Sequence, residues 1–196
     1  MAGAVALMST SVWGENMGRR AMTASNLAKA RLESQRSLPY VDLPRMAKGG
    51  LDGGFWAIYT PQGPLDRAGL ERARDFALLR GMAIREMAIA DPRRFALATR
   101  SDEAKAIAAS HRRVVFMSME NAYPLGEDTG LLRTFHAMGV RMVGFAHFLN
   151  NQFADSSTGP KGERWGGLSP LGIELLAEMN RLGIIADVSH ASDKVL

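Results

Sequence analysis

Three apolar runs in this chain each end on a side chain that can bind a metal ion. The runs and their final residues are 114–119 with Glu120, 140–146 with His147, and 183–189 with His190. The stretches between these runs show the apolar spacing of helices, so strand, potential ligand and helix alternate along the chain. In a (β/α) barrel the active site is built from side chains at the carboxyl ends of parallel strands. The pattern therefore predicts a parallel sheet with a site at one of its edges.

The rest of the chain extends this alternation. Residues 55–60 are aromatic and β-branched, which predicts a further strand. Helical spacing follows over residues 65–90, and Ser169-Pro170 has the N-cap and N1 residues expected at the start of a helix. A closed barrel has eight strands and typically about 250 residues. The 196 residues therefore predict an α/β fold that is a partial (β/α)8 TIM barrel, with about four to five βα units.

Composition limits the partners and the ligands. The chain contains no cysteine, so a metal ion would have to be bound by His, Asp or Glu. The net charge is +4, but the basic residues are scattered, and we expect no nucleic-acid partner. Because no apolar run reaches about 18 residues and the N-terminus lacks a basic signal-peptide region, we expect a soluble protein. Cytoplasmic, periplasmic and secreted locations all remain open.

The residue types at the three strand ends suit a metal centre. A carboxylate such as Glu120 can bridge two cations through its two oxygens, although a lone strand-end Glu usually faces solvent. His190 is a candidate zinc ligand, and the partner of its second ring nitrogen stays open. His147 could be a ligand or a hydrogen-bond donor to substrate. We expect the other histidines, His111 and His136, at the surface.

Several motifs occur in an order that resembles the renal (membrane) dipeptidase family of zinc metallopeptidases. They are Val41-Asp42-Leu43-Pro44, Gly53-Gly54-Phe55-Trp56-Ala57-Ile58-Tyr59, Met119-Glu120-Asn121, residues 139–147, Asn150-Asn151-Gln152-Phe153-Ala154-Asp155-Ser156, residues 166–170 and residues 179–190. The resemblance implies a barrel of the metal-dependent amidohydrolase type that hydrolyses dipeptides with two zinc ions. It implies that Glu120 bridges both ions and that His190 is a ligand. It also implies that His147 and Tyr59 contact substrate.

Two departures from the family pattern set the expected domain organisation. No His-x-Asp pair precedes Val41, and residues 1–40 read as a divergent, poorly ordered segment, with the partial barrel domain at 41–196. The resemblance also implies a further His ligand, a substrate-binding Arg and an acid-base Asp beyond residue 196. On this interpretation the chain is incomplete at both ends and contains no catalytic residue.

The resulting functional hypothesis is a zinc-dependent dipeptidase with impaired activity as a 196-residue chain. The alternatives are a non-catalytic fragment or binding protein, and a related amidohydrolase that acts on another small amide. A half-barrel leaves open sheet edges, which predicts association into homo-oligomers.

Overall fold

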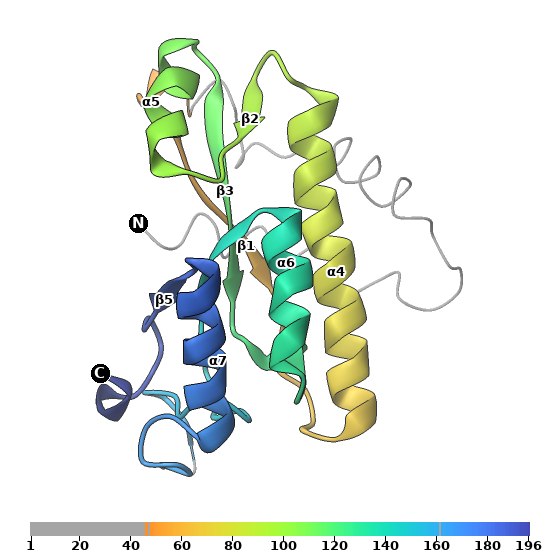
Figure 1. The fold of residues 1–196 in the computed structure, drawn as a ribbon, viewed down its shortest axis with the longest axis vertical. Helices are drawn as coiled ribbons and strands as arrows, with labels where there is room; N and C mark the ends of the chain where they lie inside the picture. Colours follow the sequence, from red (N-terminus) through yellow and green to blue (C-terminus); the bar gives the residue numbers. More distant parts are fainter. Residues whose placement is uncertain (1–45, 47, 161) are drawn as a thin grey trace. The chain divides into compact units, whose positions relative to one another are not determined.

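The computed structural model describes Met46, residues 48–160 and residues 162–196. The predicted divergent segment at 1–40 and the motif at Val41 lie outside these residues. The elements in chain order are β1 (Gly53–Tyr59), α4 (Arg67–Ala90), β2 (Phe95–Leu97), α5 (Ser101–Ala109), β3 (Arg113–Glu120), the 3₁₀ turns η1 (Tyr123–Leu125) and η2 (Thr129–Leu131), α6 (Leu132–Met138), β4 (Val140–Gly144), α7 (Pro170–Leu182), β5 (Ile185–Asp187) and the 3₁₀ turn η3 (Asp193–Val195) (Figure 1).

The strands form the parallel sheet that the sequence predicts. Its order is β1-β3-β4-β5, with β2 also paired to β3. The β2–β3, β3–β4 and β4–β5 pairs are parallel. Parallel strands joined by helical crossovers are the repeating unit of α/β proteins. The predicted α/β class is therefore confirmed. The short strand β2 is part of the same sheet as the strands that the sequence predicts.

The described chain divides into two compact units. The first contains the described residues up to Trp56 together with residues 82–116, and the second contains residues 57–81 and 117–196. In the first unit, two apolar clusters surround the buried side chains of Phe95, Val115 and Ile107. Such clusters supply most of the free energy that stabilises a fold of this size.

In the second unit, α6 and α7 lie side by side (Figure 1). The buried side chains of Phe135 on α6 and of Leu175 and Met179 on α7 give these helices their apolar faces. Helix α7 begins after Ser169, whose hydroxyl accepts a hydrogen bond from the Gly172 N–H at 3.0 Å. It ends at Gly183, where φ is +68°, a conformation that glycine adopts without steric cost. The N-cap and proline signals of the sequence therefore place this helix correctly.

Two strands end earlier than their apolar runs do. Strand β4 ends at Gly144 and β5 at Asp187. The Asp187 carboxylate accepts a hydrogen bond from the Ser189 N–H at 2.9 Å, a local turn that competes with strand pairing. Phe145 and Ala146 remain buried, so their apolar character reflects packing, and not strand pairing. None of the described helices has both the length and the apolarity needed to cross a bilayer.

Candidate metal centre

The side chains of Glu120, His147 and His190 converge at the carboxyl ends of three neighbouring strands, all within the second unit. Glu120 is the last residue of β3, and each histidine follows the end of its strand by a short turn. One potential ligand atom from each residue lies within 4.8 Å of the other two. The sequence prediction that these three strand ends form one site is consistent with this geometry.

The distances in this group suit a shared metal ion. Nε2 of His147 lies 3.4 Å from Oε1 of Glu120, and Nε2 of His190 lies 3.5 Å from the same oxygen. Two ligands of a tetrahedral zinc, each bound at about 2.1 Å, stand roughly 3.4 Å apart. A direct N–H···O hydrogen bond is usually about 2.9 Å. The separations are therefore compatible with ligands of a shared cation, and carboxylate and imidazole are both groups that bind zinc.

Burial shifts the pKa values of Glu120 and His147. Burial raises the pKa of Glu120; the neighbouring His190 opposes this shift, and Asp187 adds to it. Burial, with a smaller contribution from His190, lowers the pKa of His147 to about 4. His147 is therefore neutral at pH 7, with a free nitrogen lone pair that can bind a metal ion or accept a hydrogen bond.

The backbone of His190, and that of Asn121 next to Glu120, adopts a conformation that non-glycine residues rarely adopt. His190 has φ +66°, and Asn121, directly after Glu120, has φ +77°. A left-handed conformation costs about 1–3 kcal/mol at a non-glycine residue and persists only when its surroundings hold it. Hydrogen bonds do so at Asn121, which is fully buried: its side-chain oxygen accepts from the Tyr123 N–H and from the Asn151 amide.

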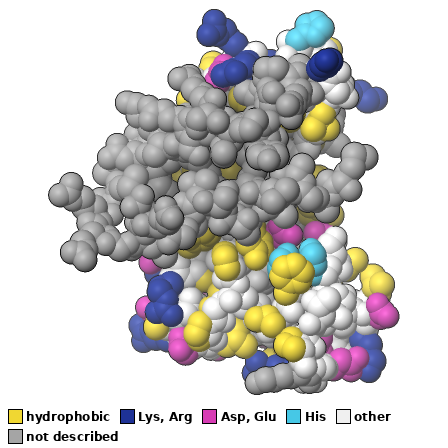
Figure 2. All heavy atoms as spheres, turned by 180° about the vertical axis from the view of Figure 1, so that it is seen from behind, with side chains coloured by type: hydrophobic (Ala, Val, Ile, Leu, Met, Phe, Trp, Pro, Cys, Tyr) yellow, Lys and Arg dark blue, Asp and Glu magenta, His cyan; other side chains and the backbone are white. Residues whose placement is uncertain are grey.

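Aromatic rings border the donor atoms. The Tyr59 ring lies 4.9 Å from the His147 ring, and the Phe148 ring lies 3.9 Å from it. Burial raises the pKa of the Tyr59 hydroxyl, with a contribution from the Glu120 charge, so the phenol remains a protonated donor. Phe148 is 58% exposed. Figure 2 shows histidine side chains against hydrophobic ones on one face.

The sequence predictions for this site have different outcomes. The structure brings Tyr59 and His147 together with Glu120 and His190, but the geometry alone does not distinguish a ligand from a substrate contact for His147. His111 is exposed and His136 is partly buried in α6, and neither belongs to the donor group. Asn151 and Asp155 are named from the sequence only as members of a motif, and Phe148 is not named.

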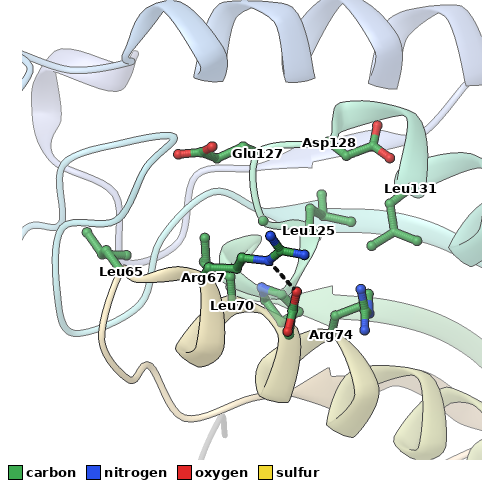
Figure 3. Close-up of a pocket in the computed structure, with 11 residues that line it drawn as sticks. Leu65, Arg67, Leu70, Arg74, Leu125, Glu127, Asp128 and Leu131 are labelled. Carbon is green, nitrogen blue, oxygen red and sulfur yellow. Dashed lines mark hydrogen bonds and ion pairs between the residues drawn. The ribbon is translucent and has the colours of Figure 1, made fainter.

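A separate cavity of about 400 Å³ lies in the second unit between the start of α4 and the segment after β3 (Figure 3). It contains none of the donor residues. The charges around it have mixed signs, and Arg67 is already paired with Glu71 through a 2.8 Å hydrogen bond. This arrangement does not favour a ligand of either charge.

Comparison with known proteins places this chain in a family. A model of the membrane dipeptidase family, peptidase family M19, matches residues 4–196. The chain therefore belongs to the membrane dipeptidase family. The resemblance in the sequence motifs is confirmed, and the match includes most of the region before residue 41.

Each individual relative matches this chain over only part of the relative's own length. Dipeptidase tcpJ of Claviceps purpurea is 34% identical over 162 residues, which are 80% of this chain and 38% of the relative. The crystal structure of the probable dipeptidase PvdM of Pseudomonas aeruginosa is 33% identical, with a TM-score of 0.72 over 79% of this chain and 41% of that one. A metallopeptidase of Rhodobacter sphaeroides, solved with a phosphinate mimic of L-Ala-D-Ala, is 26% identical, with a TM-score of 0.70 over 87% of this chain and 57% of that one. The chain spans about two fifths of the length of the curated relatives that it matches.

Proposed function

We propose that this chain contributes Glu120, His147 and His190 to the active site of a zinc-dependent dipeptidase. The convergence of their donor atoms within 4.8 Å at the carboxyl ends of parallel strands is the observation that carries this proposal. Membership of a dipeptidase family supports the reaction class. The phosphinate mimic of L-Ala-D-Ala that the Rhodobacter sphaeroides protein binds supports a dipeptide as substrate.

Each residue has a proposed role in this site. Glu120 and His190 would hold zinc, and the Glu120 carboxylate would be able to bind more than one ion. His147 and Tyr59 position the substrate, because a neutral imidazole and a protonated phenol can both hydrogen-bond to a peptide group. When bound, zinc supplies Lewis-acid chemistry, which polarises a carbonyl oxygen and lowers the pKa of water to about 7. No residue of the described chain is assigned as the general acid or base.

The partner of the proposed site is a small molecule, and we also propose that copies of the chain associate. Among the described strands, β5 pairs only with β4, and its Ile185 side chain is 55% exposed. An exposed apolar edge strand favours pairing with another chain.

Binding of zinc and of a dipeptide mimic tests the proposed function. We expect the chain to bind Zn²⁺ and to bind a phosphinate dipeptide mimic only when zinc is present, both measured by isothermal titration calorimetry. Glu120→Gln should weaken zinc binding at least about 100-fold, since loss of a direct ligand exceeds the 10–100-fold cost of changing a residue behind one. Glu127→Gln is the matched control, because Glu127 is exposed and lies outside the donor group.

Hydrolysis is a second measurement. We expect weak turnover of dipeptides by the 196-residue chain, because a two-metal site requires more ligands than Glu120 and His190 supply. Equal zinc affinity in the Glu120→Gln variant and the parent chain would reject the proposed metal site.

A further inference from the structure

The backbones around both candidate histidines are tied to one short segment, Asp155-Ser156-Ser157. The Ser156 hydroxyl donates to the backbone carbonyl of His147. The Ser157 N–H donates to the backbone carbonyl of His190 at 2.9 Å, and the Ser157 hydroxyl lies 3.2 Å from the same oxygen. Two consecutive residues, Ser156 and Ser157, therefore connect the backbones of two histidines that are far apart in the sequence.

The same segment also holds the residues next to His190. Ser156 pairs with Ala191 in an isolated antiparallel bridge, and the Asp155 carbonyl accepts from the Ser192 N–H at 2.9 Å. These bonds hold the two residues that follow His190, whose φ of +66° requires support from its surroundings. The segment is thus placed to maintain the unusual backbone conformation that directs the His190 ring towards Glu120.

Asp155 organises the segment itself. Its side chain is fully buried, and its carboxylate accepts hydrogen bonds from four consecutive backbone N–H groups: Arg164 at 2.8 Å, Trp165 at 2.9 Å, Gly166 at 2.8 Å and Gly167 at 3.1 Å. Burial alone would raise the pKa of Asp155, but these four donors hold it below its usual value. A buried carboxylate satisfied in this way fixes the loop that encloses it.

Close packing reinforces this arrangement on the loop side. Gly167 has φ +123°, and a Cβ there would lie 2.4 Å from the backbone oxygen of Lys194. Only glycine fits at this position. The loop therefore rests directly on the chain that follows His190.

We propose that residues 155–157, here named the Asp155 clamp, position His147 and His190 through their backbone carbonyls. This inference rests on the proposed function for its consequence, since positioned imidazoles matter here because they bind metal or substrate. The clamp residues are positioning residues and do not contact the donor atoms themselves. Small displacements matter because a ligand set has to be held within about 0.5 Å of its working geometry.

The test uses the double variant Ser156→Ala/Ser157→Ala, which removes two hydroxyls and leaves the backbone and Asp155 in place. The matched control is Ser110→Ala, because the Ser110 hydroxyl also donates to a backbone carbonyl, that of Ile107 at 2.6 Å, and Ser110 lies outside the donor group. Zinc affinity is measured by calorimetry, and the visible spectrum of bound Co²⁺ reports the coordination geometry. We expect the double variant to bind zinc about 10–100-fold more weakly with an altered Co²⁺ spectrum, and Ser110→Ala to match the parent chain.

A second measurement separates failure of the clamp from failure of the metal site. The chain has only four histidines, so imidazole ¹H–¹³C spectra of the metal-free protein resolve each one. The double variant should shift or broaden the signals of His147 and His190 and leave those of His111 and His136 in place. Failure of the parent chain to bind zinc would reject the metal site, while these spectra would still decide the clamp. Unchanged spectra for all four histidines would overturn the proposed clamp. If the parent chain binds zinc, equal zinc affinity in the double variant and the parent chain would also overturn it.

Discussion

Both units of the described chain bury apolar side chains, and they differ in the polar groups that they bury as well. Residues 82–116 of the first unit bury apolar side chains such as Phe95, Ile107 and Val115. The loops that follow β3 and β4 in the second unit bury polar side chains in addition to apolar ones. Asn121, Asn151 and Asp155 are all fully buried there. The buried polar side chains of the described residues all lie in the unit that contains the candidate site.

Because of this difference, the two units should lose stability in response to different mutations: one kind changes side-chain volume, and the other removes a hydrogen-bond partner. An apolar cluster loses free energy when a side chain becomes smaller. A satisfied polar network loses it when one partner is removed, even at constant volume, because buried donors are left unpaired. Variants in the first unit should therefore follow the volume rule, and variants in the loops of the second unit should follow the hydrogen-bond rule.

The largest expected loss of stability follows removal of the Asp155 carboxylate. Asp155→Ala leaves four N–H groups without their acceptor, and we expect at least about 3 kcal/mol of lost unfolding free energy, measured by urea denaturation. Asp128→Ala is the control, because the exposed Asp128 accepts one N–H bond, from Gly130, and its loss should cost about 1 kcal/mol. Similar small losses in both variants would mean that the buried network is not the main support of this unit.

The pH dependence of stability tests the same unit through His147. The pKa of His147 is lowered to about 4 in the folded chain from an ordinary value near 6.5. Below about pH 6.5 the unfolded chain therefore binds a proton that the folded chain excludes, so stability falls as the pH falls towards 4, by at most about 3 kcal/mol. Glu120, His190 and Tyr59 face this ring; the raised pKa of Glu120 offsets part of the loss at the acidic end.

The measurement is the unfolding free energy of the chelator-treated chain between pH 7.5 and 4.5, compared with that of His147→Gln. We expect the decline to be smaller in the variant, because the buried imidazole is gone. Parallel curves for the two proteins would show that His147 does not carry this dependence.

The first unit should lose stability when a buried side chain becomes smaller, and the metal site should be unaffected. Val115 is fully buried beside Met87, Ala88 and Phe95. Val115→Ala should lower the unfolding free energy by about 2 kcal/mol and leave zinc affinity within about twofold, since Val115 makes no contribution to the donor group. A large loss of zinc affinity in this variant would contradict the expectation that packing around Val115 does not affect the metal site.

The sequence indicated that three strand ends would lie close together, but it did not indicate the hydrogen-bond network around them, for a physical reason. Apolar runs that end in Glu120, His147 and His190 indicate strand ends, and the carboxyl ends of parallel strands meet at one edge of a sheet. Periodicity thus contains enough information to bring the three side chains together. It does not contain the bond from Ser157 to His190, which joins residues 33 positions apart through loops that have no repeating pattern.

The same reasoning explains the errors at the strand ends. Phe145 and Ala146 are as buried as residues of β4, so hydrophobicity could not separate them from the strand. The turn at Asp187 depends on a hydrogen bond to Ser189, which a count of apolar residues does not detect. Polar residues in a loop, such as Asp155, give no sequence signal that distinguishes a buried acceptor from a solvated one.

The smallest expected effect concerns the outside of the second unit, where an apolar side chain is exposed. Ile185 on β5 is 55% exposed, and Ile173 on α7 is 60% exposed. If copies of the chain associate through the β5 edge, Ile185→Lys should lower the mass measured by light scattering at high protein concentration, because lysine on an edge strand disfavours strand pairing. Ile173→Lys adds the same charge to a helix and should leave the association unchanged. Stability should change by less than about 0.5 kcal/mol in both variants, so equal masses for Ile185→Lys and the parent chain would remove the β5 edge as the contact.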